Sequence, residues 1–249
     1  MPTSPSCPDY TGAVTVIVPV KDEADNVLPL IEEIHAALDG RADFEVIFVD
    51  DGSSDATPAR LAEAGLRFPR LRVIRHRRSC GQSTAVSTAV RAARHPWIAT
   101  LDGDRQNDPA DIPALLARVS PGQREPGLAL VAGWRVARND SGVRKLSSKV
   151  ANGVRSRLLG DSTPDTGCGL KVFSRDVFLR LPFFDHLHRF LPALVLREGF
   201  AVVSVPVSHR ERTAGRSKYG INNRLWVGIV DLFGVMWLKR RMKHPEIDP

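Results

Sequence analysis

The stretch Trp97-Ile-Ala-Thr-Leu-Asp-Gly-Asp-Arg-Gln-Asn-Asp-Pro109 joins a short apolar run to a pair of acids. Residues 97–101 have the length and composition of a buried strand. Asp102 and Asp104 follow directly, and only Gly103, which has no side chain, separates them. In open α/β sheets, ligands bind where strands end in this way. The stretch therefore predicts a ligand site on a strand-to-helix turn.

The acids of this turn are suited to a divalent cation. Carboxylates at positions 102 and 104 can share one hard cation and leave room for a bulky ligand, and Gln106 offers a third oxygen. Asp108 predicts a helix N-cap, with Pro109 as the first helical residue. Taken alone, Asp-Gly-Asp is also an ordinary solvated turn. A second acidic pair, Asp50-Asp51, closes another apolar run and favours the ligand site.

The rest of the first half alternates between strand and helix patterns. Strands are predicted at 14–18, 44–49, 71–74, 97–101 and 128–132, and helices at 25–40, about 55–64, 83–94 and 109–119. This order predicts an α/β fold with a mostly parallel central sheet and helices on both faces. The sequence contains neither G-x-G-x-x-G nor G-x-x-x-x-G-K-[ST], so it lacks a dinucleotide fingerprint and a P-loop.

Composition places the chain among ordinary globular proteins. It has 249 residues, of which 43% are hydrophobic and 25% charged, enough for one large or two small domains. The three cysteines are far apart and form no C-x-x-C pair, which argues against a zinc site and a disulfide framework. We expect a reduced, cytoplasmic setting and a flexible N-terminus at 1–12, where no secretory signal is recognisable.

The net charge of +7 is unevenly distributed. Residues 1–132 hold 14 Lys and Arg against 18 Asp and Glu, whereas residues 133–249 hold 21 against 10. An acidic half that can bind a cation is thus joined to a basic half that can bind polyanions. Nucleic acid, phosphates and an anionic membrane surface are the partners that such a half can take.

The second half is less regular. Its predicted features are a strand end at Gly133-Trp-Arg135, a cationic helix at about 143–159, a Gly-rich turn at Asp165-Thr-Gly-Cys-Gly-Leu-Lys171 leading into a strand, a helix at 187–197 and a strand at 201–207. The loop at 210–219 carries four cations and a Gly, which suits it to fold over a phosphate.

The C-terminal segment 222–243 predicts an amphipathic helix. Its apolar part, residues 225–238, spans roughly 20 Å at 1.5 Å per residue, whereas the hydrocarbon core of a bilayer is about 30 Å thick. We expect it to lie in a membrane interface, with Trp226 and Trp237 at headgroup depth and the terminal cations on lipid phosphates. The alternative is a core or dimer helix that covers the sheet.

Together these stretches resemble the inverting glycosyltransferases of family 2, which have the GT-A fold, and especially their dolichol- or polyprenyl-phosphate sugar synthase branch, the dolichyl-phosphate mannosyltransferase-like proteins. The resemblance runs from about residue 14 to 241 and rests on the order and spacing of several short motifs. These are Val18-Pro19 with Glu23, Val49-Asp-Asp-Gly-Ser-Ser-Asp55, Gly81-Gln82, Asp102-Gly-Asp104 with Gln106, Gly133-Trp-Arg135, Arg144-Lys-Leu-Ser-Ser148, Asp165-Thr-Gly-Cys-Gly169, and Arg212 with Ser217-Lys218-Tyr219.

The resemblance implies a role for particular residues. Mg²⁺ or Mn²⁺ would be held by Asp102, Asp104 and Gln106, and the nucleotide sugar by Pro19, Lys21, Glu23, Asp50, Asp51 and Gly103. Lys21 stands where the family often has an aromatic residue. The acceptor phosphate would be bound by Arg135, Arg144 and Ser148, and the catalytic residues would be Asp104, Arg135, Arg212 and Lys218. It also implies a GT-A domain at 13–219, with a nucleotide-sugar half at 13–132, a basic acceptor half at 133–219, and a membrane-associating helix and tail at 220–249.

The implied activity is metal-dependent, inverting transfer of a sugar from GDP-mannose or a UDP-sugar to the phosphate of a polyprenyl or dolichyl phosphate. The absence of Q-x-x-R-W, a signature of processive members that act on hydroxyls, agrees with a phosphate acceptor. We expect a peripheral position on the cytoplasmic face of the inner membrane, with contact through 222–243; an integral-membrane partner or a homodimer stays open. Nucleic acid is not an expected partner, because aromatic residues are too few for a base-stacking platform.

Three alternatives remain at this stage. The nearest is a glycosyltransferase that acts on a hydroxyl of a glycan or small molecule. A nucleotidyltransferase would use a similar sheet, but usually has a Gly-rich, Lys-containing stretch after the first strand, where this chain has Pro19-Val-Lys-Asp-Glu23. A non-catalytic anion-binding protein would explain the basic half and leave the acidic strand ends unexplained.

Overall fold

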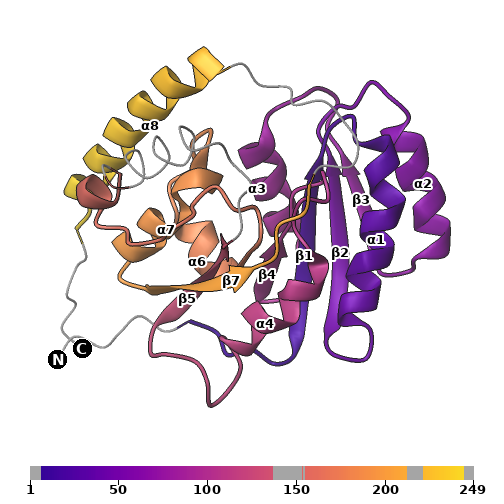
Figure 1. Ribbon diagram of the computed structural model, residues 1–249, viewed down its shortest axis with the longest axis horizontal. Helices are drawn as coiled ribbons and strands as arrows, with labels where there is room; N and C mark the ends of the chain where they lie inside the picture. The colour runs from indigo at the N-terminus through magenta and orange to yellow at the C-terminus, as the bar shows by residue number, and fades with distance from the viewer. Residues whose placement is uncertain (1–6, 137–152, 154, 212–220, 244–249) are drawn as a thin grey trace.

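The computed structural model describes residues 7–136, 153, 155–211 and 221–243, with side chains of the last segment described from residue 227. One sheet of seven strands crosses this part of the chain in the order β3-β2-β1-β4-β6-β5-β7 (Figure 1). The strands are β1 (Ala13–Val20), β2 (Asp43–Asp50), β3 (Leu71–Arg75), β4 (Trp97–Thr100), β5 (Leu128–Arg135), β6 (Lys171–Ser174) and β7 (Ala201–Val207). The predicted α/β class with a mostly parallel sheet is confirmed.

β6 is the strand that departs from the parallel pattern. It pairs antiparallel with β4 on one side and with β5 on the other. The chain enters β6 at the edge where β4 ends, so that Lys171 pairs with Thr100. This reversal carries the Gly-rich turn at 165–170 to the same edge as the acidic turn after β4. A sequence pattern of short strands does not reveal that reversal, because direction leaves no mark on hydrophobic periodicity.

Helices cover both faces of the sheet, as predicted. They are α1 (Ala24–Leu38), α2 (Thr57–Arg67), α3 (Gln82–Ala92), the 3₁₀ turn η1 (Pro109–Asp111), α4 (Ile112–Ala117), α6 (Arg175–Arg180), α7 (Leu187–Arg197) and α8 (Ile221–Arg241). Alternate residues of β1 point to opposite faces: Val16 packs in the core beneath α1, α2 and α4, and Ile17 in the core beneath α3, α6 and α7.

Local capping confirms part of the sequence interpretation and corrects part of it. Asp108 accepts a hydrogen bond from the amide of Ala110 at 2.9 Å, as an N-cap should. The predicted helix at 109–119 instead begins as η1 and ends as α4 at Ala117. The short helix α6 was not predicted; Ser174 caps it by accepting from the amide of Val177. Six residues are too few for helical periodicity to stand out.

The C-terminal helix α8 lies beside α7 at the end of the molecule (Figure 1). Val235 is buried at 1% exposure and joins the core beneath α7, whereas Val230, Phe233 and Trp237 are 68%, 62% and 59% exposed. One face of α8 therefore packs on protein and another presents apolar side chains to the surroundings. Among the described residues, no helix combines the length and the apolar character that crossing a membrane requires.

Candidate functional site

The acidic turn after β4 is packed tightly against two other segments. Asp102 accepts a hydrogen bond from the side-chain amide of Gln82, at the start of α3, at 2.9 Å. A Cβ atom at Gly169 would lie 2.2 Å from Oδ2 of Asp102, and one at Gly103 would lie 2.6 Å from a methyl group of Val20. The glycines thus allow the Gly-rich turn and β1 to approach the acids closely.

The electrostatics of the turn favour a cation. Burial, followed by the neighbouring Asp104, raises the pKa of Asp102, and Lys171 and Arg135 partly oppose that rise. Asp104 also accepts a hydrogen bond from the amide of Gln106 at 3.2 Å, which fixes the turn. Two carboxylates this close fit a divalent cation that completes its shell with phosphate oxygens and water. The predicted ligand role of Asp102, Asp104 and Gln106 stays a prediction.

An ion-pair network fixes the outer side of the turn. Arg105, at a left-handed φ of 59°, pairs with Glu33 of α1 at 2.5 Å. Arg210 bridges Glu33 at 2.7 Å and Asp108 at 2.6 Å, and its amide donates to the carbonyl of Gln106 at 2.9 Å. The segment after β7 is thereby attached to the acidic turn. The sequence did not indicate this network, because its members are far apart in the chain.

Apart from Gly103, which lies in the acidic turn after β4, the predicted nucleotide-binding residues lie at or just beyond the ends of β1 and β2. Pro19 lines a cavity beside Asp102, and Lys21 is exposed just beyond β1. Glu23 accepts a hydrogen bond from the side chain of Asn26 at 2.6 Å. Asp50 is buried, accepting from the amide of Ser53 at 2.8 Å and pairing with Arg75 at 3.2 Å.

Asp51 faces the loop after β3. Its carboxylate accepts from Ser79 Oγ and the amides of Cys80 and Gly81 and contacts His76 Nδ1, all at 2.8–2.9 Å. Burial raises the pKa of Asp51, but these hydrogen bonds outweigh it and lower the pKa overall. Ligand atoms of Asp51, His76 and Cys80 lie within 4.8 Å of one another, yet the carboxylate is already saturated with donors. The predicted contact of Asp51 with a nucleoside stays a prediction.

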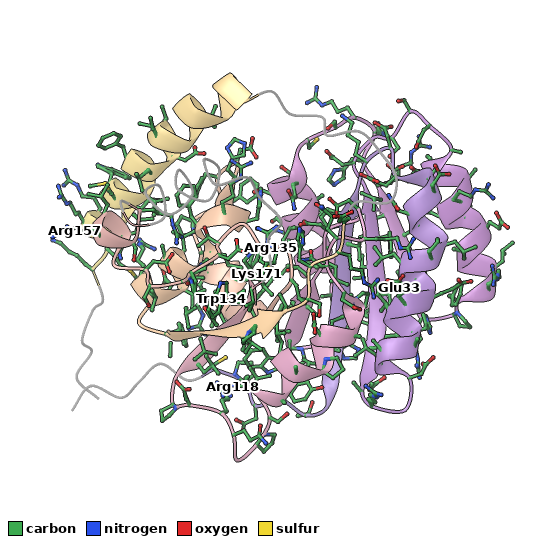
Figure 2. The ribbon with its side chains drawn as sticks, viewed as in Figure 1. Glu33, Arg118, Trp134, Arg135, Arg157 and Lys171 are labelled. Carbon is green, nitrogen blue, oxygen red and sulfur yellow. The ribbon has the colours of Figure 1, made fainter. Side chains whose placement is uncertain are left out.

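The basic side of the site is built on Arg135, the last residue of β5. Its guanidinium donates two hydrogen bonds to Asp165, at 2.6 and 2.9 Å. Burial lowers the pKa of Arg135, and the Asp165 carboxylate raises it by more, so the cation is held firmly. Arg135 lies near Lys171 at the centre of the molecule (Figure 2). The other predicted phosphate-binding residues, Arg144, Ser148, Arg212 and Lys218, lie outside the described residues.

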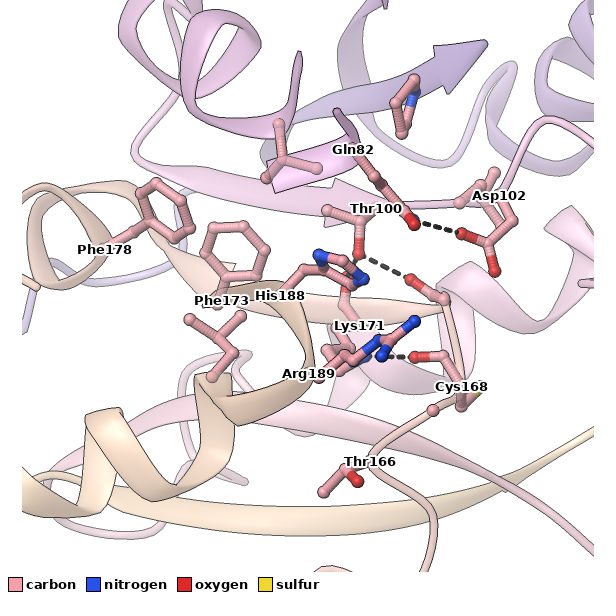
Figure 3. A pocket seen from close by; sticks show the side chains of 16 residues that line it. Gln82, Thr100, Asp102, Thr166, Cys168, Lys171, Phe173, Phe178, His188 and Arg189 are labelled. Atoms are coloured by element: carbon pink, nitrogen blue, oxygen red, sulfur yellow. Dashed lines mark hydrogen bonds between the residues drawn. The ribbon is translucent and has the colours of Figure 1, made fainter. Parts of the chain in front are cut away.

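A cavity of about 380 Å³ lies between the acidic turn, the Gly-rich turn and α7 (Figure 3). Its polar lining includes Asp102, Lys171, His188 and Arg189. Lys171 is buried and donates to the carbonyl of Cys168, and burial lowers its pKa. Burial also lowers the pKa of His188 to about 3; its Nδ1 lies 2.8 Å from the hydroxyl of Ser83.

Sequence reasoning missed these cavity residues as functional. Lys171 did carry a signal, because a cation at the first position of a buried strand is unusual. His188 and Arg189 carried none: they interrupt an apolar helical pattern in the way that a solvated face does.

The family profile of glycosyl transferase family 2 matches residues 15–181. The dodecaprenyl-phosphate galacturonate synthase of Rhizobium johnstonii is 36% identical over 237 residues, covering 93% of this chain and 69% of that protein. The undecaprenyl-phosphate 4-deoxy-4-formamido-L-arabinose transferase of Edwardsiella ictaluri is 33% identical, covering 84% of this chain and 63% of that protein. The chain thus spans about two thirds of the length of these relatives.

Two solved structures share the fold at lower identity. Glucosyl-3-phosphoglycerate synthase from Mycobacterium tuberculosis, in complex with Mg²⁺ and UDP, superposes with a TM-score of 0.69 at 18% identity, over 94% of this chain and 81% of that one. A mannosyltransferase from Pyrobaculum calidifontis, in complex with GDP-Man and Mn²⁺, superposes with a TM-score of 0.67 at 21% identity, over 96% of this chain and 68% of that one.

Proposed function

Because the chain belongs to glycosyl transferase family 2, we propose that it moves a sugar from a nucleotide donor to the phosphate of a polyprenyl phosphate. The observation that carries the proposal is a cavity that Asp102 lines and that reaches the Gly-rich turn beside the Arg135–Asp165 pair. A Cβ atom at Gly167, which lines this cavity, would lie 3.4 Å from Nη2 of Arg135. The names of two relatives, both of which act on polyprenyl phosphates, support the choice of acceptor.

The chemistry is a displacement at the anomeric carbon. An acceptor phosphate oxygen forms the new C–O bond while the bond to the nucleoside diphosphate breaks and the electron pair leaves with the diphosphate. Mg²⁺ or Mn²⁺, held by Asp102 and Asp104 with Gln106, would stabilise the charge on the leaving group. Arg135 supplies a fixed cation that orients the acceptor phosphate. Solved structures of the fold contain one or the other ion with a nucleotide, which supports a divalent cation and leaves its identity open.

No strong general base is needed for this reaction. A phosphate monoester is largely ionised at pH 7 and is already a nucleophile. The imidazole nearest to the cavity, that of His188, has a pKa of about 3, so it is a poor proton acceptor at neutral pH. A hydroxyl acceptor would instead need a residue that removes its proton. A phosphate acceptor therefore asks less of these residues than a hydroxyl acceptor does.

The exposed apolar face of α8 is proposed as the contact with the membrane that holds the acceptor. Val230, Phe233 and Trp237 recur at helical spacing, and Lys239, Arg240 and Arg241 follow them at the end of the helix. This combination binds anionic lipid surfaces through apolar burial and charge together. Attachment on the cytoplasmic face, a homodimer and an integral-membrane partner stay predictions.

Labelled nucleotide sugars test the proposal. The protein is incubated with a short polyprenyl phosphate, a divalent cation and one donor at a time: GDP-mannose, UDP-glucose, UDP-galacturonate or a UDP-amino sugar. We expect at least one donor to label the organic-soluble lipid, and polyprenol without the phosphate to stay unlabelled. Labelling only of a water-soluble hydroxyl acceptor would contradict the proposal and favour the nearest alternative.

A further inference from the structure

The cavity beside Asp102 lies where the donor sugar must sit. In a displacement that inverts the anomeric carbon, the leaving diphosphate and the attacking phosphate lie on opposite sides of the ring. Asp102 lines the cavity of about 380 Å³, and Gly167 in the same lining lies beside Arg135; this volume is within the range of small-ligand sites. The part of the sugar remote from the anomeric carbon therefore faces the walls formed by α3, β6 and α7.

One wall of this cavity carries two cations. Lys171, at the start of β6, is only 5% exposed, and Arg189 projects from the first turn of α7 (Figure 3). The guanidinium of Arg189 makes no hydrogen bond or ion pair with any residue that the structure describes. Among the described residues of the lining, Asp102 is the single carboxylate; it accepts a hydrogen bond from Gln82 and is assigned above to the divalent cation. Arg189 thus brings to this wall a positive charge without a counter-charge among the described residues, and the Lys171 amine adds N–H donors.

Another part of the lining, partly on the same strand and helix, is apolar. Phe173 and Phe178 stack at 5.2 Å between ring centroids, and Val86 and Leu191 lie in the same lining. Such surfaces pack against the C–H faces of a sugar ring and bind no second phosphate. Under the proposed function the diphosphate is assigned to the divalent cation and the acceptor phosphate to Arg135, so the anion left to meet Lys171 and Arg189 is one carried by the sugar.

We propose that this cavity selects a donor sugar with a carboxylate, a hexuronate, and that Arg189 is the residue that recognises it. The inference rests on the proposed function, whose sugar it specifies. A planar guanidinium matches a carboxylate with two parallel hydrogen bonds, and the Lys171 amine is a further N–H donor nearby. A neutral hexose would offer the Arg189 guanidinium no counter-charge, which is how a polar pocket disfavours the wrong substrate.

Transfer kinetics with matched donors test the proposal. UDP-galacturonate and UDP-glucuronate are compared with UDP-galactose and UDP-glucose, using the full chain and a short polyprenyl phosphate. We expect kcat/KM to be higher by at least about 10-fold for one hexuronate than for its neutral counterpart. Arg189→Gln should lower kcat/KM for that hexuronate by roughly 10- to 100-fold and change the value for the neutral sugar by less than about threefold. The control Arg180→Gln, an exposed cation on α6 outside the cavity, should change neither.

Calorimetric binding of the same four UDP-sugars, without acceptor, separates the two proposals. If a hexuronate binds more tightly than its neutral counterpart and Arg189→Gln abolishes that preference, the pocket assignment is supported. This holds even if no donor labels the lipid, because in that case only the proposed acceptor is wrong. Equal binding of acidic and neutral sugars, or binding of none of them, overturns the pocket assignment. An equal loss for both sugars in Arg189→Gln also overturns it, because Arg189 would then serve the diphosphate or the fold.

Discussion

Asp102 shows at the scale of one residue how much of the site the sequence reveals. Its spacing from Asp104 and its place after a buried strand predict a cation-binding turn without any structure. Two basic side chains, Lys171 and Arg135, oppose the rise in the pKa of Asp102, and they come from strands that are remote in sequence. No local pattern predicts that β6 runs against its neighbours and carries Lys171 to Asp102. The acidic pair was therefore predictable from local sequence, whereas the position of Lys171 in the cavity wall was not.

His188 gives a prediction at the same scale. Its folded pKa of about 3 lies below the value near 6.5 expected in the unfolded chain, because burial disfavours the charged ring. The unfolded state therefore binds more protons between these values, and stability falls as the pH is lowered from about 6.5 toward 3. We expect the wild type to lose about 1 kcal/mol more of its free energy of unfolding than His188→Gln between pH 6 and 5. Urea unfolding at the two pH values measures this; parallel losses in the two proteins would refute the buried neutral histidine.

At the scale of elements, the site depends on two turns that meet at one edge of the sheet. The strand and helix patterns predicted most elements, but α6 and the split of the helix after Asp108 were too short to be read from periodicity. The contact between the acidic turn and the Gly-rich turn follows from the antiparallel direction of β6. That direction is set by tertiary packing, which a local pattern does not encode.

Gly169→Ala tests the contact between these turns. The added methyl group would lie 2.2 Å from Oδ2 of Asp102, so one of the turns must shift. Because a displacement of about 1 Å at a reacting centre is costly, we expect transfer to fall by on the order of 100-fold, with the fold retained. Gly65→Ala, in α2, is the control, since nothing lies within 4 Å of the added atom. Unchanged transfer rates in Gly169→Ala would show that the close approach has no catalytic role.

Helix α8 provides the second prediction at this scale. Replacing Val230, Phe233 and Trp237 by Ser removes exposed apolar surface without touching the buried Val235. We expect the triple variant to sediment with anionic liposomes at least about 10-fold less well, because burial of apolar side chains drives interfacial binding. Leu66→Ser, at a residue of α2 that is 89% exposed, is the matched control and should bind like the wild type. If all three proteins bind equally, α8 is not the membrane contact.

At the scale of the whole molecule, the fold joins an acidic half to a basic half through one continuous sheet. The charge imbalance in the sequence indicated that division, and β5 and β6 show how the halves meet: Arg135 ends one strand, and Lys171 begins the other. A sugar between these groups faces the acids on one side and cations on the other. Under the proposed function, the cation, the donor and the acceptor phosphate therefore act at one place.

The most direct test of this joint action is a transfer assay. It measures the label that the wild type and Asp104→Ala transfer to polyprenyl phosphate, each with and without a divalent cation. The donor is whichever labelled nucleotide sugar the wild type accepts. We expect the wild type to label the lipid with Mg²⁺ or Mn²⁺ and to stop in a chelator, and Asp104→Ala to be slower by at least about 100-fold, since the cation stabilises the leaving group by several kcal/mol. Full activity of Asp104→Ala in the chelator would contradict the account.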